Sequence, residues 1–153
     1  MTHKILEEII MSLHRYCFIL LLALLLIPGI LFASDSKYSY ISATDLETRL
    51  TANLPINIVD IQVEEEFAKH HIKGAIPTHA YPVKSDADHS KLNATIEQLK
   101  ANTDPVVIVC PRGAGGAKRT YDYLLQKEVS TERLLILEKG QSGWASTPLT
   151  ESN

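Results

Sequence analysis

Short apolar runs alternate with amphipathic segments along residues 38–148. Near-continuous apolar runs of this length are typical of strands buried on both faces of a sheet, whereas apolar positions three or four residues apart are typical of helices. The pattern predicts strands at 38–41, 56–61, 105–110 and 133–137, and helices at 43–51, 64–70 and 117–127. Their alternation predicts a single α/β domain with a mainly parallel central sheet flanked by helices.

Capping residues and core spacing refine these elements. Ser42 precedes the first helix and Asp45 follows three residues later, as at a helix N-cap. Residues 78–90 are polar and are predicted to form a loop, and residues 74–77 a turn or short strand. The predicted core positions are Leu92, Ile96 and Leu99 on one helical face, Tyr121, Leu124 and Leu125 on another, and Trp144 in a Gly/Ser-rich tail.

The first 33 residues form a separate, more hydrophobic part of the chain. Eighteen uncharged residues run from Tyr16 to Ala33, interrupted by a Pro-Gly pair and ending in a small residue before a polar one. We interpret residues 1–33 as a signal peptide, and we hypothesise that translation starts at Met11, which leaves a short basic segment before the apolar run. The alternative is an uncleaved membrane anchor, for which eighteen residues are the lower limit.

Both interpretations place the domain at 38–148 outside the cytoplasm. The signal, combined with the fold, indicates a bacterial periplasm, and the alternative is an inner-membrane anchor facing the periplasm. Contact with a membrane is expected only if the N-terminal segment is uncleaved. The sequence does not indicate the oligomeric state.

Charge and cysteine content narrow the function. The 153-residue chain has a formal net charge of −3, so nothing favours nucleic acid as a partner. Cys17 lies in the apolar N-terminal run, and removal of a signal peptide leaves Cys110 as the one cysteine of the mature chain. A free thiol is unusual in an exported protein and indicates a reactive group.

Cys110 ends a buried strand and opens the loop Cys-Pro-Arg-Gly-Ala-Gly-Gly. In parallel sheets, ligands bind beyond the carboxyl ends of the strands. A glycine-rich loop turns N–H groups inward around an anion, and the next helix adds its positive end, so thiolate is favoured over thiol. The candidate residues are Cys110 as nucleophile, the loop Pro111, Arg112, Gly113, Ala114, Gly115 and Gly116, and the supporting Asp60, Lys118 and Arg119.

Other interpretations of these residues are weaker. The phosphate-binding patterns GxxxxGK[ST] and GxGxxG are absent from the chain. An isolated cysteine at a strand end is usually an inert core thiol, but the glycine-rich loop argues against that interpretation. His70, His79 and His89 have neither i, i+4 spacing nor a cysteine partner, so no metal site is expected.

Four segments follow one another within residues 40–146, namely 58–67, 67–76, the loop that Cys110 opens and 137–144. In this order they resemble the motifs of the rhodanese (sulfurtransferase) domain family. Residues 58–67 (IVDIQVEEEF) are similar to its first strand-to-helix segment, and 67–76 (FAKHHIKGAI) to its F-x3-H-[IV]-P-G-A signature. Cys110 resembles the residue that opens the active-site loop, and 137–144 (LEKGQSGW) is similar to the terminal G-G-x-x-G-W element. The resemblance implies a structural role for His71.

The resemblance also implies an enzyme, a rhodanese-type sulfurtransferase. The Cys110 thiolate would take sulfane sulfur from thiosulfate or a polysulfide-type donor, and the loop N–H groups would hold the persulfide. A thiophilic acceptor, cyanide or a thiol, would then remove the sulfur. These small donors and acceptors are the implied partners, and no metal or organic cofactor is implied.

Departures from the family pattern leave alternatives open. Gln62 stands where the family often has arginine, and Gly115 where it often has a basic residue, so thiosulfate and polysulfide-type donors both remain candidates. Related phosphatases use C-x5-R, and Gly116 occupies the arginine position, so phosphatase activity is not expected. The rivals to a sulfurtransferase are a non-catalytic binding or regulatory module of the same fold and a thiol redox sensor.

Overall fold

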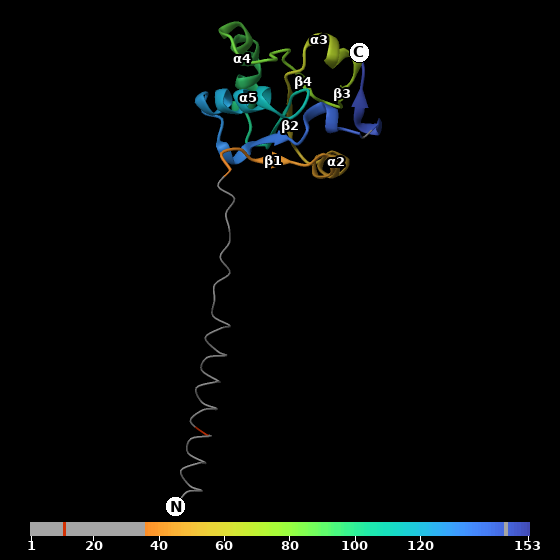
Figure 1. Ribbon diagram of the computed structural model, residues 1–153, viewed down its shortest axis with the longest axis vertical. Coiled ribbons are helices and arrows are strands. Elements are labelled where there is room, and N and C mark those ends of the chain that lie inside the picture. Colours follow the sequence, from red (N-terminus) through yellow and green to blue (C-terminus); the bar gives the residue numbers. More distant parts are fainter. Residues whose placement is uncertain (1–10, 12–35, 146) are drawn as a thin grey trace, which may run out of the picture. The chain divides into compact units, whose positions relative to one another are not determined.

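Five parallel strands form the central sheet in the order β1-β6-β5-β2-β4. Figure 1 shows the domain, with β1, β2 and β4 of this sheet labelled. They are Tyr40–Ile41 (β1), Asn57–Asp60 (β2), Ile76–Pro77 (β4), Val106–Val109 (β5) and Leu134–Leu137 (β6). The computed structural model describes Met11, residues 36–145 and residues 147–153, and residues 36–153 form one compact unit. The predicted α/β class and parallel sheet are confirmed.

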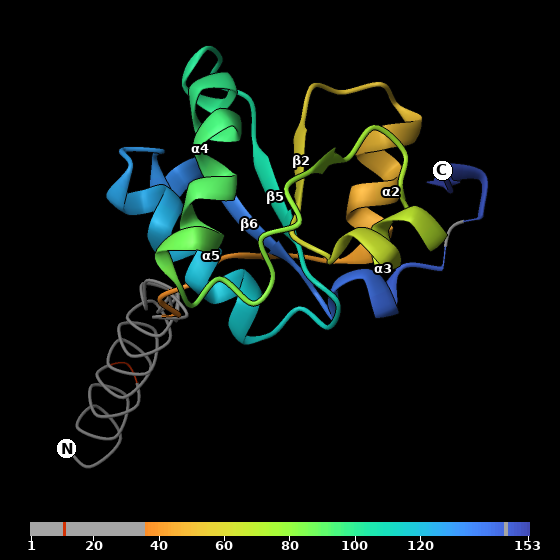
Figure 2. The same ribbon diagram turned by 90° about the horizontal axis from the view of Figure 1, so that it is seen from above.

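Helices cover both faces of the sheet. Figure 2 shows α4 and α5 on one side, and α2 and α3 on the other. In β5, Val106 and Ile108 join the apolar cluster of α4 and α5, whereas Val107 and Val109 join the cluster of α2, because successive side chains of a strand point to opposite faces. The helices are Ala43–Thr51 (α2), Glu64–Lys69 (α3), Asp86–Lys100 (α4) and Gly115–Gln126 (α5).

The helix starts show where the sequence pattern succeeded and where it failed. Ser42 caps α2 as predicted, because its side chain accepts a hydrogen bond from Asp45 N at 3.0 Å. The prediction of a loop through residue 90 is wrong, since α4 already begins at Asp86. Ser85 and Asp88 form a capping box there, with each side chain bonded to the other's backbone N–H.

Helix α5 also differs from the prediction. It begins at Gly115, two residues earlier than expected, and ends at Gln126. Tyr121 and Leu124 are buried as predicted, but Leu125 is 43% exposed, so its assignment to the core is wrong. Position 125 lies beyond the arc of the helix that packs on the sheet.

A second, two-stranded antiparallel sheet was not predicted. It pairs His71–Ile72 (β3) with Thr150–Glu151 (β7) near the C-terminus. Strands of two residues are too short for alternation to reveal them. Trp144 is buried as expected and donates from its indole N–H to Thr150 Oγ1 at 3.1 Å. The short 3-10 turns are Thr131–Arg133 (η1), Gly140–Gly143 (η2) and Thr147–Leu149 (η3).

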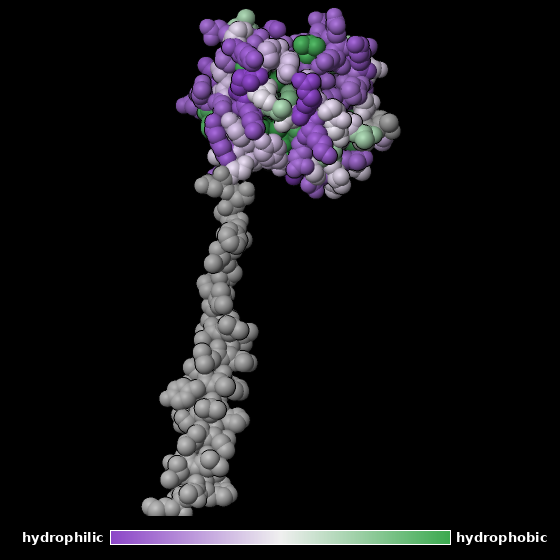
Figure 3. All heavy atoms as spheres, in the orientation of Figure 1, coloured by the Kyte–Doolittle hydropathy of each residue, from purple (hydrophilic) through white to green (hydrophobic). Residues whose placement is uncertain are grey.

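The visible face of the domain is mostly hydrophilic, with apolar residues only in small patches (Figure 3). Among the residues that the structure describes, no helix is both long enough and apolar enough to cross a membrane. The predicted signal peptide at 1–33 falls outside the described part of the chain, apart from Met11.

Candidate active-site loop

Cys110 lies at the carboxyl edge of the central sheet. It follows β5 directly, and Asp60 ends the neighbouring strand β2, opposite Val109. A hydrogen bond of 2.9 Å from Ile61 N to Val109 O joins the strands at this edge. Cys110 is a free thiol, 2% exposed, and belongs to the apolar cluster beneath α4 and α5. The two residues therefore meet where parallel sheets bind ligands.

The loop from Pro111 to Ala114 leads from Cys110 into α5. Gly113 has a φ of +63°, and a Cβ there would lie 2.6 Å from Lys139 N, so the position requires glycine. Within the described residues, the N–H groups of positions 112–117 donate to no protein acceptor. The first turn of α5, which has no side-chain cap, thus adds free donors and the positive end of a helix.

A second loop, which includes the turn η2, holds the first in place. Gln141 N donates to Cys110 O at 2.9 Å, and Ser142 N donates to Pro111 O at 3.0 Å. Gly140 lies against the same backbone, since a Cβ there would overlap Cys110 O and lie 2.8 Å from Arg112 N. The motif 137–144, singled out in the sequence, is therefore the support of the cysteine loop.

The three predicted cations have different surroundings. Arg112 is exposed and lines the pocket described below. The Lys118 ammonium lies 5.3 Å from the centre of the Tyr38 ring. The Arg119 guanidinium donates to Pro82 O at 2.7 Å and to Val83 O at 3.0 Å, and so ties α5 to the loop before α4. Of the three, Arg112 is the cation that the fold brings to the pocket.

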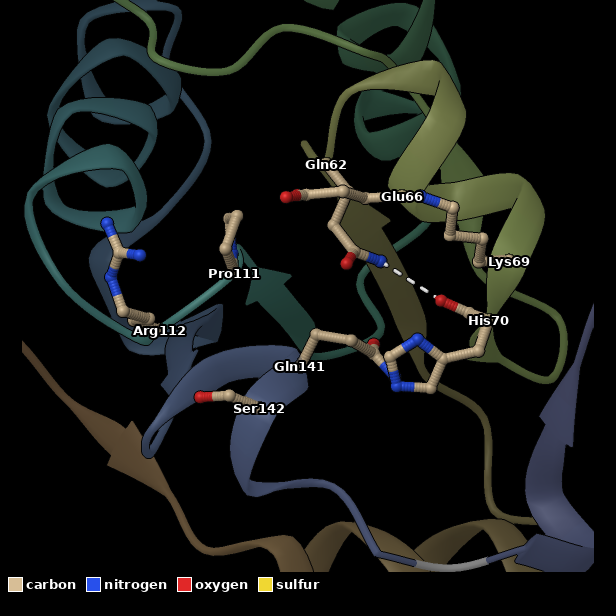
Figure 4. A pocket seen from close by; sticks show the side chains of 8 residues that line it. All are labelled: Gln62, Glu66, Lys69, His70, Pro111, Arg112, Gln141 and Ser142. Atoms are coloured by element: carbon tan, nitrogen blue, oxygen red, sulfur yellow. Dashed lines mark hydrogen bonds between the residues drawn. The ribbon is translucent and has the colours of Figure 1, made fainter.

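A pocket of about 420 Å³ lies between α3 and the cysteine loop (Figure 4). Its lining comes from three separate segments of the chain, because the β2–α3 segment, the cysteine loop and η2 converge at the same edge of the sheet. Gln141 is 2% exposed, and neither its Nε2 nor its Oε1 has a hydrogen-bond partner. The lining residues are Gln62, Glu66, Lys69, His70, Pro111, Arg112, Gln141 and Ser142.

Asp60 supports the pocket through hydrogen bonds to Gln62. The carboxylate is fully buried and accepts from Gln62 N at 2.8 Å and from Gln62 Nε2 at 3.0 Å. Burial raises the pKa of Asp60 to about 6, although the Gln62 hydrogen bonds and the nearby His71 and His79 lower it in part. Asp60, which the sequence analysis names as a supporting residue, therefore bonds directly to the pocket residue Gln62.

His71 has the environment of a structural residue. Its ring is buried, stacks on Phe67 at 3.8 Å, and its Nδ1 bonds Phe67 O at 2.8 Å. Across the described residues, no group of three or more His, Cys, Asp or Glu side chains is arranged to hold a metal ion.

Of the eight lining residues, the site predicted from the sequence contains Pro111 and Arg112. Gln62 was considered only as a departure from the family pattern, and His70 only as a metal ligand. The sequence analysis did not single out the other four, namely Glu66, Lys69, Gln141 and Ser142. The first two looked like an ordinary solvated helix face. The third and fourth lie inside the Gly-x-x-Gly-Trp motif, and that motif was the signal available, because a loop with two spaced glycines before a tryptophan indicates close backbone packing.

Comparison with known proteins gives one family. The family model described as Rhodanese-like domain matches residues 42–147. A rice (Oryza sativa subsp. japonica) protein named arsenate reductase 2.1 is 32% identical over 115 residues, which cover 69% of this chain. The matched part spans 66% of the rice protein's own length, less than two thirds.

Solved structures share the fold. The crystal structure of a rhodanese-like domain protein from Staphylococcus aureus is 25% identical, with a TM-score of 0.52, and covers 75% of this chain and 98% of that one. A thiosulfate sulfurtransferase from Pseudomonas aeruginosa is 17% identical, with a TM-score of 0.55, and covers 75% of this chain and 20% of that one. The second match is evidence of the fold alone.

Proposed function

This chain belongs to the rhodanese-like domain family, and from that membership we propose that it is a sulfurtransferase that carries sulfane sulfur as a persulfide on Cys110. The observation that carries the proposal is the array of unpaired N–H groups at positions 112–117, which directly follows the thiol. Such donors stabilise an anion, and both a thiolate and a terminal persulfide sulfur are anions at neutral pH.

The reaction proceeds in two half-reactions. The Cys110 thiolate attacks the outer sulfur of thiosulfate, a new S–S bond forms, and sulfite leaves with the electrons of the broken bond. An acceptor such as cyanide then attacks the outer sulfur of the persulfide. Thiocyanate leaves and the Cys110 thiolate is restored, so the kinetics are ping-pong.

The donor is thiosulfate or a polysulfide-type molecule. Arg112 is the cation of the cysteine loop that lines the pocket, and it supplies positive charge for an anionic donor. Gln62 and Gly115 supply none, which favours donors of lower charge than thiosulfate. The low exposure of Cys110 favours small donors.

Intact mass spectrometry tests the proposal. The protein is incubated with thiosulfate, and separately with polysulfide, and then measured without reductant. A gain of about 32 Da, one sulfur atom, is expected in the wild type, is lost on adding cyanide, and is absent in Cys110→Ser. If no sulfane donor gives an adduct, the domain is a binding or regulatory module; oxygen adducts on Cys110 without sulfur transfer would favour a redox sensor.

Arsenate reduction is a second candidate, favoured by the 32% identity to the rice protein. The same unpaired N–H groups suit an oxyanion. Against it, Gly116 stands six positions after Cys110, where C-x5-R enzymes place an arginine clamp. Arsenite formed from arsenate and a thiol reductant above the Cys110→Ser background, without any persulfide from sulfane donors, would favour the reductase.

We also propose that the domain acts outside the cytoplasm, since residues 1–33 have the composition of a signal peptide. Fractionation of bacterial cells that express the full chain tests this, with the periplasm as the expected location. N-terminal sequencing separates a cleaved signal from an anchor. A precursor peptide that contains Lys4 would exclude the start at Met11.

A further inference from the structure

Gln141 has a buried amide without partners, and it lines the pocket together with Pro111, the residue that follows Cys110. The side chain is 2% exposed, and neither amide atom is hydrogen-bonded. Buried amides are normally paired, because an unpaired donor or acceptor raises the free energy of the folded state. Figure 4 shows the Gln141 side chain among the residues that line the pocket. The amide is therefore free to form hydrogen bonds with a ligand that enters the pocket.

Gln62 adds a hydrogen-bond acceptor on the opposite wall. Its Nε2 donates to Asp60 Oδ2 at 3.0 Å and to His70 O at 3.4 Å, so both amide hydrogens are engaged. The orientation leaves Oε1 as the free group of the carboxamide. With Gln141, the pocket offers a donor and acceptors, which together match the single N–H and single C=O of a secondary amide.

The charges of the pocket favour a carboxylate. Arg112 and Lys69 line it from the cysteine loop and from α3, and Glu66 is the single acidic residue of the lining. Among the described residues, neither the Arg112 side chain nor the Lys69 side chain has an ion-pair or hydrogen-bond partner. Guanidinium binds carboxylate through two parallel hydrogen bonds, and the ammonium adds a point charge.

We propose that this pocket binds the organic part of a thiol acceptor that carries both a carboxylate and a secondary amide, the chemistry of N-acylated amino-acid and peptide thiols, with Gln141 as a specificity residue. The inference rests on the proposed function. The acceptor thiolate attacks the outer sulfur of the Cys110 persulfide, an S–S bond forms in the product persulfide, and the bond to Cys110 breaks with the electron pair returning to Cys110. A volume of about 420 Å³ suits a ligand of this size.

A series of acceptors separates the two recognition elements. N-acetylcysteine has both the carboxylate and the amide, N-acetylcysteamine has the amide only, and 2-mercaptoethanol has neither. Gln141→Met keeps the shape of the side chain and removes its hydrogen-bonding groups. It is expected to lower kcat/KM about 10-fold for the two amide thiols and less than twofold for 2-mercaptoethanol and cyanide.

Two further variants complete the design. Lys69→Met is expected to lower kcat/KM for N-acetylcysteine and to leave N-acetylcysteamine unchanged. The matched control Gln98→Leu replaces an exposed glutamine on α4, outside the pocket, and is expected to leave every acceptor unchanged. An equal loss with all acceptors in Gln141→Met, cyanide included, would overturn the proposal, because a disturbed loop gives that result. No loss with any acceptor would overturn it as well.

Binding of an inert analogue keeps this inference distinct from the proposed function. N-acetylalanine has the carboxylate and amide of N-acetylcysteine but no sulfur, and NMR titration measures its Kd. The expected result is binding to the wild type at least about 10-fold tighter than to Gln141→Met. Binding without any sulfur adduct on Cys110 would reject the sulfurtransferase and keep the ligand class. An adduct without binding or selectivity would reject the ligand class alone.

Discussion

The backbone of Gly140 lies directly against the carbonyl of Cys110. A Cβ at position 140 would overlap that oxygen and Gly113 N, and the φ of +57° also favours glycine. The next residue, Gln141, donates from its N–H to the same carbonyl at 2.9 Å. The cysteine loop and the turn η2 are therefore one packed unit, and a change in either moves the other.

Replacement of Gly140 by alanine is expected to disrupt this unit. The methyl group meets backbone atoms, which have no rotamer in which to move away, so a loss of more than about 3 kcal/mol in the free energy of unfolding is expected. Sulfur loading of Cys110 should be lost in the molecules that remain folded. Urea unfolding and intact mass measure the two effects.

Gly74→Ala is the matched control. Gly74 also has a positive φ, +76°, but apart from its two chain neighbours no residue has an atom within 4 Å of the position that an added methyl group would take. A loss of about 1 kcal/mol from backbone strain, with sulfur loading retained, is expected. Equal effects of the two substitutions would contradict the packed unit.

Arg112 is expected to attract anionic donors. Arg112→Gln removes the cation that lines the pocket and should raise KM for thiosulfate about 5-fold, because an exposed charge contributes about 1 kcal/mol. The effect should shrink in high salt. Steady-state kinetics at two salt concentrations measure both, with Lys127→Gln, the same change of charge at the other end of α5, as control. A KM that does not change would show that Arg112 plays no part in donor binding.

Asp60 gives the stability a pH dependence. Its pKa is about 6 in the folded state and 3.8 in the reference state, so between these values the unfolded chain has lost a proton that the folded protein keeps. Asp60 therefore stabilises the folded state below pH 4. The free energy of unfolding falls by about 3 kcal/mol as the pH rises to 6 and above. Urea unfolding measures the free energy of unfolding of the wild type and of Asp60→Asn. The difference between the two proteins should change over this pH interval, and a constant difference would contradict the titration of Asp60.

Ser85 is expected to stabilise the start of α4. Ser85→Ala removes the hydroxyl that accepts from Asp88 N at 3.2 Å, and a loss of about 1 kcal/mol, or about 4 °C in Tm, should follow. Ser90→Ala, in the body of the same helix, is the control and should change Tm by less than about 2 °C. If both variants melt alike, the capping box contributes nothing measurable.

The sequence by itself determined the elements whose signals are local. Val106–Val109 form a strand because an uninterrupted apolar run is stable only when both faces of the strand are covered, and Cys110 follows it at the functional edge. Ser42 identified the start of α2 because capping involves neighbouring residues. The equally local signal of Ser85 and Asp88 was hidden by the polar composition around it.

Only the tertiary structure decided which distant residues meet. Gln141 bonds Cys110, Arg119 turns to Pro82 and Val83, and β7 pairs with β3. These contacts depend on how loops close and pack against one another, and no periodicity along the chain records them. The sequence therefore determined the sheet and the place of the thiol, whereas the pocket beside it exists because separate loops converge at one edge of that sheet.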